Sequence, residues 1–372
     1  MTDSQAYVAF NLTEKVGIAT VSELVSRAGS VAAAWEAYPK KVSRTGGEVD
    51  WEGEFRKAAG FGVQILTPAD ADYPSLLKNA PGAPLALYVK GDVRALSKPS
   101  VAMIGTRRAT DYGRTVARRL SHDLAQAGWC IVSGLALGID GEAHRGALEA
   151  EGVTVGVIGS GLDCFYPEEN RELAREIVKK GGAVVSEFPF GRSPDQQTFP
   201  IRNHVVAALA RGVVAVEAPL KSGTLITTGI AADLGRTVMA VPARVDNRMS
   251  SGCLKLIRDG AILVRDVDDV LEAMSELLPR GGRETRDGRP EEGFSPDALR
   301  LTSSSDPETP KYSVEEALVM THVDEDGISL DELVRATGLP AAQVSALAMS
   351  LRIKGFVRFL PGNRISLLTR CR

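Results

Sequence analysis

The sequence has little of what a metal site, a disulfide framework or a membrane anchor requires. Its four cysteines show no CxxC spacing and its four histidines are scattered, which argues against a zinc site and against disulfides. No run of 18 apolar residues occurs, and the N-terminal MTDSQAYVAF has no basic segment followed by a long apolar one. We therefore expect no membrane segment and a soluble, cytoplasmic protein.

An excess of positive charge is also lacking. The net charge is −3, so the composition gives no reason to expect nucleic acid, and any anion site must be a local concentration of Lys and Arg. The apolar content of 44% and the charged content of 24% are typical of a globular chain. At 372 residues the chain is long enough for two or three domains.

Three segments differ in composition from the centre of the chain. Residues 1–75 show helix-period apolar positions and predict a small helical domain. Residues 279–310 are rich in Pro, Gly, Ser and charge, which predicts a flexible linker. Residues 311–372 contain three helix-like stretches followed by FVRFLPGNRISLL, a hairpin turned at Pro361–Asn363, and predict a winged helix domain.

Residues 76–278 predict an α/β domain. After a proline-containing extended connector, short apolar strands alternate with amphipathic helices, which indicates a Rossmann-like, doubly wound, mostly parallel sheet covered on both faces. A ligand of such a sheet lies at the carboxyl ends of the strands, near the switch point. The predicted strands are VAMIG (101–105), WCIVSG (129–134), TVGVIG (154–159), AVVSE (183–187), VVAVEA (213–218), TVMAV (237–241) and AILV (261–264).

Glycine-containing loops follow four of these strands. They are GTRRATDYG, SGLALGIDGEAH, GSGLDCFYPEEN and APLKSGTLITTG. Glycine at a strand end lets backbone amides approach an anion closely, and the next helix N-terminus adds positive potential. One such loop can be a plain turn, but four on one rim predict an anion site.

The loops do not fit the common nucleotide folds. The first turn is G-T-R-R instead of G-x-G-x-x-G, and the second strand ends in Ser133-Gly134 where NAD enzymes place an acid. Lys221-Ser222-Gly223-Thr224 reverses the order of a P-loop. An NAD dehydrogenase and a P-loop NTPase are therefore disfavoured, and we expect no cofactor.

Candidate catalytic residues are few. Asp140 and His144 lie four residues apart and could form an acid–base dyad, but a helix cap beside a hydrogen-bonded histidine is the commoner arrangement. Glu187 and Glu217 end strands and could be acids near a ligand, yet neither belongs to a nucleophile–base–orienter pattern. We predict no catalytic residue and no metal ligand.

The cations offer a better explanation. Arg107 directly follows the first strand, so its guanidinium can point into the crevice, whereas Arg118 and Arg119 fit a solvated helix face. The FPIRN segment, 199–203, places an arginine and an amide beside an aromatic ring, and Lys221 lies in the fifth strand's loop. Phosphate-binding cations with one exposed stacking ring are typical of a single-stranded nucleic acid site.

These segments together resemble the bacterial DNA-processing protein A family, also called Smf, over about residues 70–265. The resemblance rests on GTRRATDYG, SGLALGID-x₃-H, GSGLD-x₂-YPEEN, SEFPFG, FPIRN, VEAPLKSGTLIT and LIRDGA. It implies a non-enzymatic recombination mediator that binds and protects incoming single-stranded DNA during natural transformation. It further implies loading of the RecA recombinase and a homodimer formed through the Rossmann-like domain, for which the apolar segment 253–264 is a candidate surface.

The resemblance also implies which residues contact DNA. Thr106 stands where relatives usually have Ser, and Leu137 where they often have Arg, which implies a less positive pocket than usual. The DNA-binding residues implied are Gly105, Thr106, Arg107, Gly161, Phe199, Arg202, Asn203, Lys221, Ser222, Gly223 and Thr224.

Two alternatives remain open. A related Rossmann-like group hydrolyses nucleoside monophosphates with a P-G-G-x-G-T loop followed by a catalytic Glu, whereas this chain has K-S-G-T-L-I-T and no acid in the next turn. A double-stranded DNA regulator would read the groove with the winged helix. Its predicted recognition helix has cations only at Arg352 and Lys354, whereas groove readers need several, so protein contact is the favoured role of that domain.

Overall fold

The computed structural model divides the chain into two compact units, Met1–Glu284 and Thr285–Arg372, and each is described by itself. The predicted linker, 279–310, lies outside the described residues. The structure describes residues 1–39, 42–43, 46–275, 314–324, 327–340, 343–344, 347–348, 351, 356–360 and 364–367.

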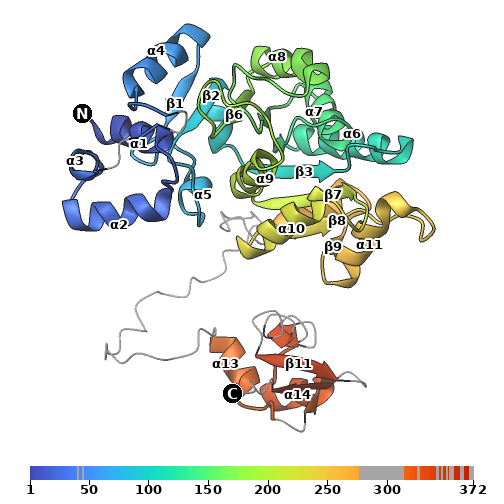
Figure 1. Ribbon diagram of the computed structural model, residues 1–372. Coiled ribbons are helices and arrows are strands. Elements are labelled where there is room, and N and C mark those ends of the chain that lie inside the picture. The colour runs from blue at the N-terminus through green and yellow to red at the C-terminus, as the bar shows by residue number, and fades with distance from the viewer. Residues whose placement is uncertain are drawn as a thin grey trace, which may run out of the picture. The chain divides into compact units, whose positions relative to one another are not determined.

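The first unit is built around a nine-stranded sheet with the order β1-β2-β6-β5-β4-β3-β7-β8-β9 (Figure 1). From β6 to β9 all neighbouring strands pair in parallel, whereas β2 pairs antiparallel with both β1 and β6. The predicted Rossmann-like, mostly parallel sheet is therefore confirmed. The strands are β1 (Gln64–Leu66), β2 (Leu87–Gly91), β3 (Ser100–Gly105), β4 (Cys130–Ser133), β5 (Thr154–Val157), β6 (Ala183–Ser186), β7 (Gly212–Glu217), β8 (Thr237–Ala240) and β9 (Ile262–Leu263).

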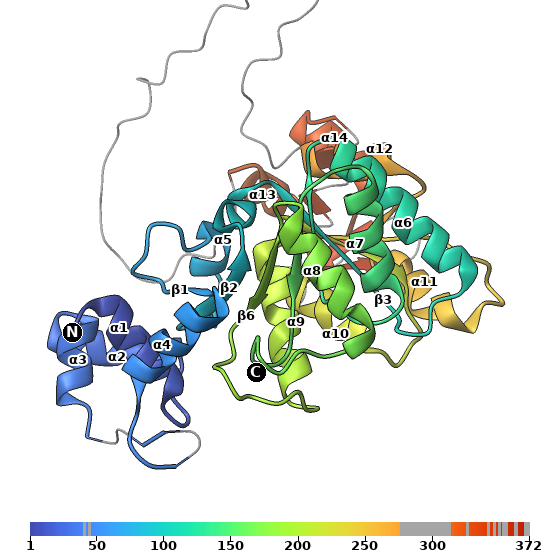
Figure 2. The ribbon, with the colours of Figure 1, turned by 90° about the horizontal axis from the view of Figure 1, so that it is seen from above.

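Helices cover both faces of this sheet, as the view from above shows (Figure 2). Successive side chains of a strand point to opposite faces, so Ala102 and Ile104 of β3 join one core, and Val101 and Met103 join the other. The helices are α5 (Ser75–Lys78), α6 (Asp111–Gln126), α7 (Ile139–Glu149), α8 (Arg171–Lys179), α9 (Thr198–Leu209), α10 (Gly223–Asp233), α11 (Ser251–Arg258) and α12 (Val267–Ser275).

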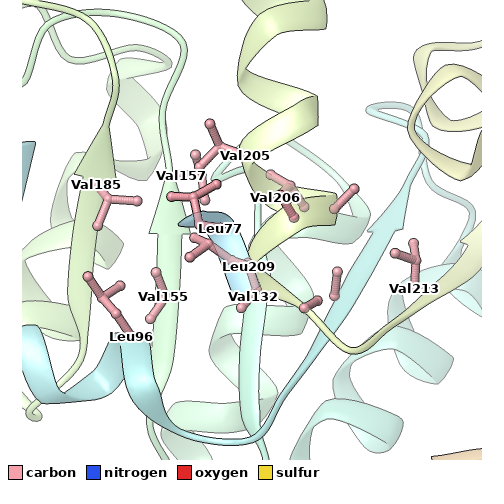
Figure 3. Packing of buried hydrophobic residues seen from close by; sticks show 14 of the residues in the cluster. Leu77, Leu96, Val132, Val155, Val157, Val185, Val205, Val206, Leu209 and Val213 are labelled. Atoms are coloured by element: carbon pink, nitrogen blue, oxygen red, sulfur yellow. The ribbon is translucent and has the colours of Figure 1, made fainter. Parts of the chain in front are cut away.

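Branched apolar residues of the parallel strands form the core beneath α9. Val132, Val155 and Val185 come from three neighbouring strands and belong to one buried cluster with Val205 and Leu209 of α9 (Figure 3). The second core lies between the opposite face and α6, α7 and α12. Because apolar side chains cover both faces, the strands read as continuous apolar runs in the sequence.

Two strands of the sheet differ from the prediction. β2 lies in the segment expected to be an extended connector, and β1 lies within residues 1–75, expected to be helical. Both form because Leu87, Tyr88 and Val89 are buried and their backbone pairs with β1 on one side and β6 on the other. The domain boundary near residue 75 stays a prediction, since the sheet begins at Gln64.

Four helices precede the sheet: α1 (Asp3–Leu12), α2 (Ile18–Ala28), α3 (Val31–Ala37) and α4 (Trp51–Phe61). Their core centres on Phe10, whose ring packs edge-on against Trp35 with centroids 5.1 Å apart. Gly29 ends α2 in the left-handed region, with φ 88°, which glycine adopts without strain. On the sheet side, the buried Glu54 of α4 accepts a hydrogen bond of 2.9 Å from the Phe190 amide.

The second unit has the elements of the predicted winged helix. Its three-stranded sheet has the order β10-β12-β11 and packs with the helices around one apolar core. The hairpin turn Pro361–Asn363, the cations Arg352 and Lys354, and most of the third expected helix lie outside the described residues. The elements are α13 (Val314–Met320), β10 (Ile328–Ser329), α14 (Leu330–Thr337), β11 (Val357–Leu360) and β12 (Arg364–Leu367).

The cysteines of the described part are free thiols. Cys130 is buried, and burial raises the pKa of its thiol to about 12, whereas Cys164 is only half-buried. No three His, Cys, Asp or Glu side chains cluster as metal ligands among the described residues. Likewise, none of the described helices has the length and apolar character needed to cross a bilayer.

Truncating Leu120 tests the core beneath α6. Its side chain is completely buried in the α6–α7 cluster, so Leu120→Ala leaves a cavity and should lower the free energy of unfolding by about 2–5 kcal/mol. Leu220→Ala, at an exposed position, should change it by less than about 0.5 kcal/mol. Urea unfolding followed by circular dichroism measures both, and equal effects of the two changes would contradict the packing described.

Candidate functional site

A cavity of about 470 Å³ opens at the carboxyl ends of β3 and β7. These strands are neighbours at the switch point, because β4, β5 and β6 follow on one side of β3 while β8 and β9 follow on the side of β7. Crevices at this place are where open α/β sheets bind ligands. The cavity is lined by ten of the predicted residues: Gly105, Thr106, Arg107, Phe199, Arg202, Asn203, Lys221, Ser222, Gly223 and Thr224.

Gly161 is the predicted residue that does not line this cavity. Its amide donates to the carbonyl of Arg192 at 2.8 Å, and a Cβ at this position would lie 2.6 Å from the carbonyl oxygen of Pro189. Its backbone therefore packs one loop against another, and its amide is not available to an anion.

The buried carboxylate of Glu217 fixes the turn between β3 and α6. Its two oxygens accept from the amide and the hydroxyl of Thr110, each at 2.8 Å, and its carbonyl accepts from the Thr106 amide at 2.7 Å. Charge-assisted bonds of this kind are stronger than neutral ones. The sequence suggested that Glu217 could be an acid near a ligand. In the structure its carboxylate instead accepts hydrogen bonds from the turn that carries Arg107.

Arg107 is exposed, and its guanidinium carbon lies 4.6 Å from the centroid of the Phe199 ring. This is a cation–π contact, which orders the arginine without neutralising it. No ion pair of Arg107 is found within the described part of the chain. Asp111, four residues further along the chain, has its Oδ1 3.6 Å from Arg114 Nε.

Tyr166 is a second aromatic residue beside Arg107 that sequence reasoning missed. Its ring centroid lies 6.2 Å from that of Phe199, and the two planes are tilted by 50°. The side chain is 47% exposed, and with Arg107 and Phe199 it lines a small hollow next to the cavity. The signal available was an aromatic residue in one of the four glycine-containing loops.

Arg202 forms the floor of the cavity and is only 6% exposed. Its Nη1 donates to the carbonyls of Gly134 and Val157, the latter at 2.9 Å, and its Nε donates to Asn203 Oδ1 at 3.1 Å. Burial lowers the pKa of its guanidinium, opposed by the nearby carboxylate of Asp140. The expected phosphate-binding cation is thus a buried charge that braces two strand-end segments, those of β4 and β5.

Only glycine fits at position 134. A Cβ there would lie 2.3 Å from Arg202 Nη1 and 2.6 Å from Asp140 Oδ2. Asp140 is itself buried and accepts from the Ala136 amide at 3.4 Å, and burial raises the pKa of its carboxyl. The glycine of the second loop therefore makes room for a buried cation and a carboxyl beneath the cavity.

The N-terminus of α10 forms the opposite wall. Ser222 is its N-cap residue, but its side chain caps no amide, and its Oγ is buried without a hydrogen-bond partner in the described structure. Gly223, the first residue of the helix, would place a Cβ no closer than 4.0 Å to any neighbour, Asn203 Nδ2 being the nearest. Free amides, a free hydroxyl and the exposed Lys221 beside them favour an anion here.

Asp140 and His144 do not form a dyad. His144 is completely buried and its Nδ1 lies 2.7 Å from Thr154 Oγ1. Because the Thr154 hydroxyl donates to the Ile131 carbonyl at 2.7 Å, Nδ1 must be the donor to Thr154 Oγ1. The histidine is therefore hydrogen-bonded, as expected, but the expected helix cap is wrong, since Gly138 and not Asp140 is the N-cap of α7.

Burial lowers the pKa of His144 to about 3 from an ordinary value of 6.5. Below pH 6.5 the unfolded chain then binds more protons than the folded one. The contribution of His144 to the free energy of unfolding is therefore complete above pH 6.5 and is lost as the pH falls toward 3. Relative to His144→Asn, which keeps a donor for Thr154, the wild type should lose about 2 kcal/mol of unfolding free energy between pH 6.5 and 5. Urea unfolding at each pH measures this free energy for the wild type and for His144→Asn. Parallel plots of the two free energies against pH would contradict a neutral, buried His144.

Comparison with known proteins gives consistent matches. A family model described as DNA recombination-mediator protein A matches residues 64–275, and one described as the DprA winged helix domain matches residues 303–363. Protein Smf of Synechocystis sp. is 36% identical over 316 residues, which cover 81% of this chain and 79% of that protein. Protein Smf of Escherichia coli is 34% identical over 307 residues, covering 82% and 78%.

Two solved structures are similar as well. DNA processing protein A from Streptococcus pneumoniae superposes with a TM-score of 0.62 at 32% identity, covering 73% of this chain and 98% of that one. DNA processing protein A from Helicobacter pylori, a structure described as giving insight into that protein's unique single-stranded DNA binding mode, has a TM-score of 0.53 at 30% identity. That match covers 58% of this chain and 97% of the other.

Proposed function

Since the chain belongs to the DNA recombination-mediator protein A family, we propose that it binds single-stranded DNA in the cavity between β3 and β7. The observation that carries the proposal is the composition of the cavity wall. Exposed Arg107 and Lys221 come from opposite sides of the crevice. The aromatic pair of Phe199 and Tyr166 lies beside Arg107, and the N-terminus of α10 lies beside Lys221. Phosphate contacts next to stacking rings are what a single strand requires.

The polar groups divide between phosphate and base. Arg107, Lys221, the Ser222 hydroxyl and the first amides of α10 are suited to phosphate oxygens. Arg107 covers one face of the Phe199 ring, so a base stacks on the guanidinium plane or on the more exposed ring of Tyr166. Duplex DNA has no unstacked base to offer these rings, which favours a single strand.

We further propose that the protein acts in the cytoplasm as a recombination mediator. In this role it protects incoming single-stranded DNA during natural transformation and loads RecA onto it. Membership of the family supports this role. A strand held through phosphates and stacked bases presents no sequence-specific contacts, as a mediator that accepts any incoming DNA requires.

No catalytic step is part of the proposal. Among the described residues that line the cavity, Asp140 is the one carboxylate, and it is buried beside Arg202 and the Ala136 amide. The alternative, a nucleoside-monophosphate hydrolase, requires an accessible acid next to its substrate. Release of free base on incubation with AMP or GMP would favour that alternative.

Removing the exposed cations tests the site through its salt dependence. Arg107→Ala and Lys221→Ala should each weaken single-strand binding and lower the slope of log affinity against log salt by about 0.7, since each loses one phosphate contact. Phe199→Ala should cost about 1–3 kcal/mol with little change of slope, because it removes the ring that supports Arg107 and Tyr166 for stacking but removes no cation. Fluorescence anisotropy with a labelled oligothymidylate over a salt series measures these values.

Lys98→Ala is the matched control. Lys98 is exposed and precedes the amino end of β3, the end of the strand opposite to Arg107, so its loss should leave the slope unchanged. Should Arg107→Ala lower the melting temperature while affinity and slope stay at wild-type values, Arg107 would be a structural brace, and the proposed site would be wrong.

A homodimer through the Rossmann-like domain is also proposed. β9 is the last strand of the sheet, and its Ile262 and Leu263 are 43% and 41% exposed. An exposed apolar edge strand is a surface that natural proteins usually pair or cover. It lies within the segment 253–264 that the sequence offered as a contact surface.

Light scattering at micromolar concentration should return twice the mass of one chain, and Leu263→Lys at the edge should return the mass of one. A single-chain mass for the wild type would contradict the dimer. A dimeric Leu263→Lys would exclude β9 as its surface.

A further inference from the structure

A second hollow, of about 400 Å³, lies along α6. Tyr112, Thr115, Val116 and Arg119 line it from the helix, at the i, i+3, i+4, i+7 spacing that places residues on one face. Segments that follow β8 and β9, including Pro242, form its other side. We call this hollow the α6 groove.

Tyr112 offers an ordered aromatic surface in the groove. Its side chain is 48% exposed, and its hydroxyl donates to the carbonyl of Pro242 at 3.0 Å. That bond fixes the far end of the ring while nearly half of the side chain stays open to solvent. A ring held in this way loses little conformational entropy when a base stacks on it.

The charge of the groove is positive. Arg119 donates to the carbonyl of Arg265 at 3.3 Å and forms no ion pair within the described residues, so its charge is not neutralised. Arg265 is paired with Asp269 at 2.6 Å and adds no net charge. The sequence suggested one solvated face for Arg118 and Arg119, but Arg118 pairs with Glu149 and Glu142, and only Arg119 lines the groove.

The groove begins close to the cavity along the chain. Arg108, exposed and without an ion pair in the described structure, lines the cavity and lies four residues before Tyr112. From Asp111 to Arg119 the helix rises by about 12 Å. Arg108, Tyr112 and Arg119 therefore follow one another from the cavity rim along α6.

We propose that the α6 groove is a second contact surface for single-stranded DNA, which binds the nucleotides that extend beyond the cavity. Tyr112 stacks a base and Arg119 contacts a phosphate. This inference rests on the proposed function of the cavity. The charge of the groove and the position of Tyr112, four residues after Arg108 of the cavity, favour a polyanion carrying unstacked bases over a second protein chain.

Strand length separates the two surfaces. An oligothymidylate of about 5 nucleotides can occupy the cavity alone, whereas one of about 20 can reach the groove as well. Tyr112→Leu should weaken binding of the long strand at least about fivefold and leave the short one unchanged, and Tyr112→Phe, which keeps the ring, should retain most of the affinity. Arg119→Ala should lower the salt slope by about 0.7 for the long strand only.

Arg118→Ala, at the neighbouring paired arginine, is the control and should behave as wild type with both strands. Unchanged binding of the long strand by Tyr112→Leu and Arg119→Ala would overturn the proposal, as would an equal loss for both strand lengths. A change from dimer to monomer mass in Tyr112→Leu would assign the groove to a second copy of the chain instead. If the wild type binds neither the short nor the long strand, the proposed function of the cavity is wrong. That result differs from each of the variant outcomes above, all of which require binding by the wild type.

Discussion

The carboxylate of Glu217 holds in place the part of the molecule on which the proposed site depends. It ends β7 and binds the turn between β3 and α6 through both side-chain oxygens, while its carbonyl binds the same turn at Thr106. Gly113 leaves room for it, since a Cβ there would lie 2.4 Å from Glu217 Oε2. The turn that carries Arg107 is therefore fixed relative to the strand that leads into Lys221 and α10, and the cavity lies between them.

A local concentration of charge accounts for an anion site on a chain of net charge −3. Arg107, Arg108, Arg202 and Lys221 line the cavity with one carboxylate, Asp140, among the described lining residues. Arg202 contributes its charge from the floor, where carbonyl groups hold the guanidinium and burial weakens screening by salt. The exposed arginine and lysine can then release counterions when phosphates bind, so the buried and the exposed cations contribute in different ways.

Much of this arrangement could be predicted from the sequence, for identifiable reasons. The parallel strands are continuous apolar runs, and the carboxyl ends of neighbouring parallel strands meet at one edge, so loops far apart in the chain could be placed together. β2 was missed because it follows a stretch with several prolines, and β1 because it has only 3 residues. Arg202 was expected as a phosphate-binding cation and Gly161 as a DNA contact, since neither the burial of a side chain nor the partner of an amide can be read from residue type. Tyr166 was missed because one tyrosine in a loop is not a pattern.

The two neighbouring arginines of α6 show where sequence reasoning reaches its limit. Residues that follow each other on a helix are rotated by about 100°, so a pair of arginines always points in two directions. Arg118 forms ion pairs with two glutamates, whereas Arg119 donates a hydrogen bond to a backbone carbonyl and lines the open groove. One charge is neutralised by carboxylates from α7, and the other stays available to an anion. What distinguishes the two residues is the surface packed against α6. Beside Arg118 that surface is α7, and beside Arg119 it consists of segments more than 100 residues further along the chain.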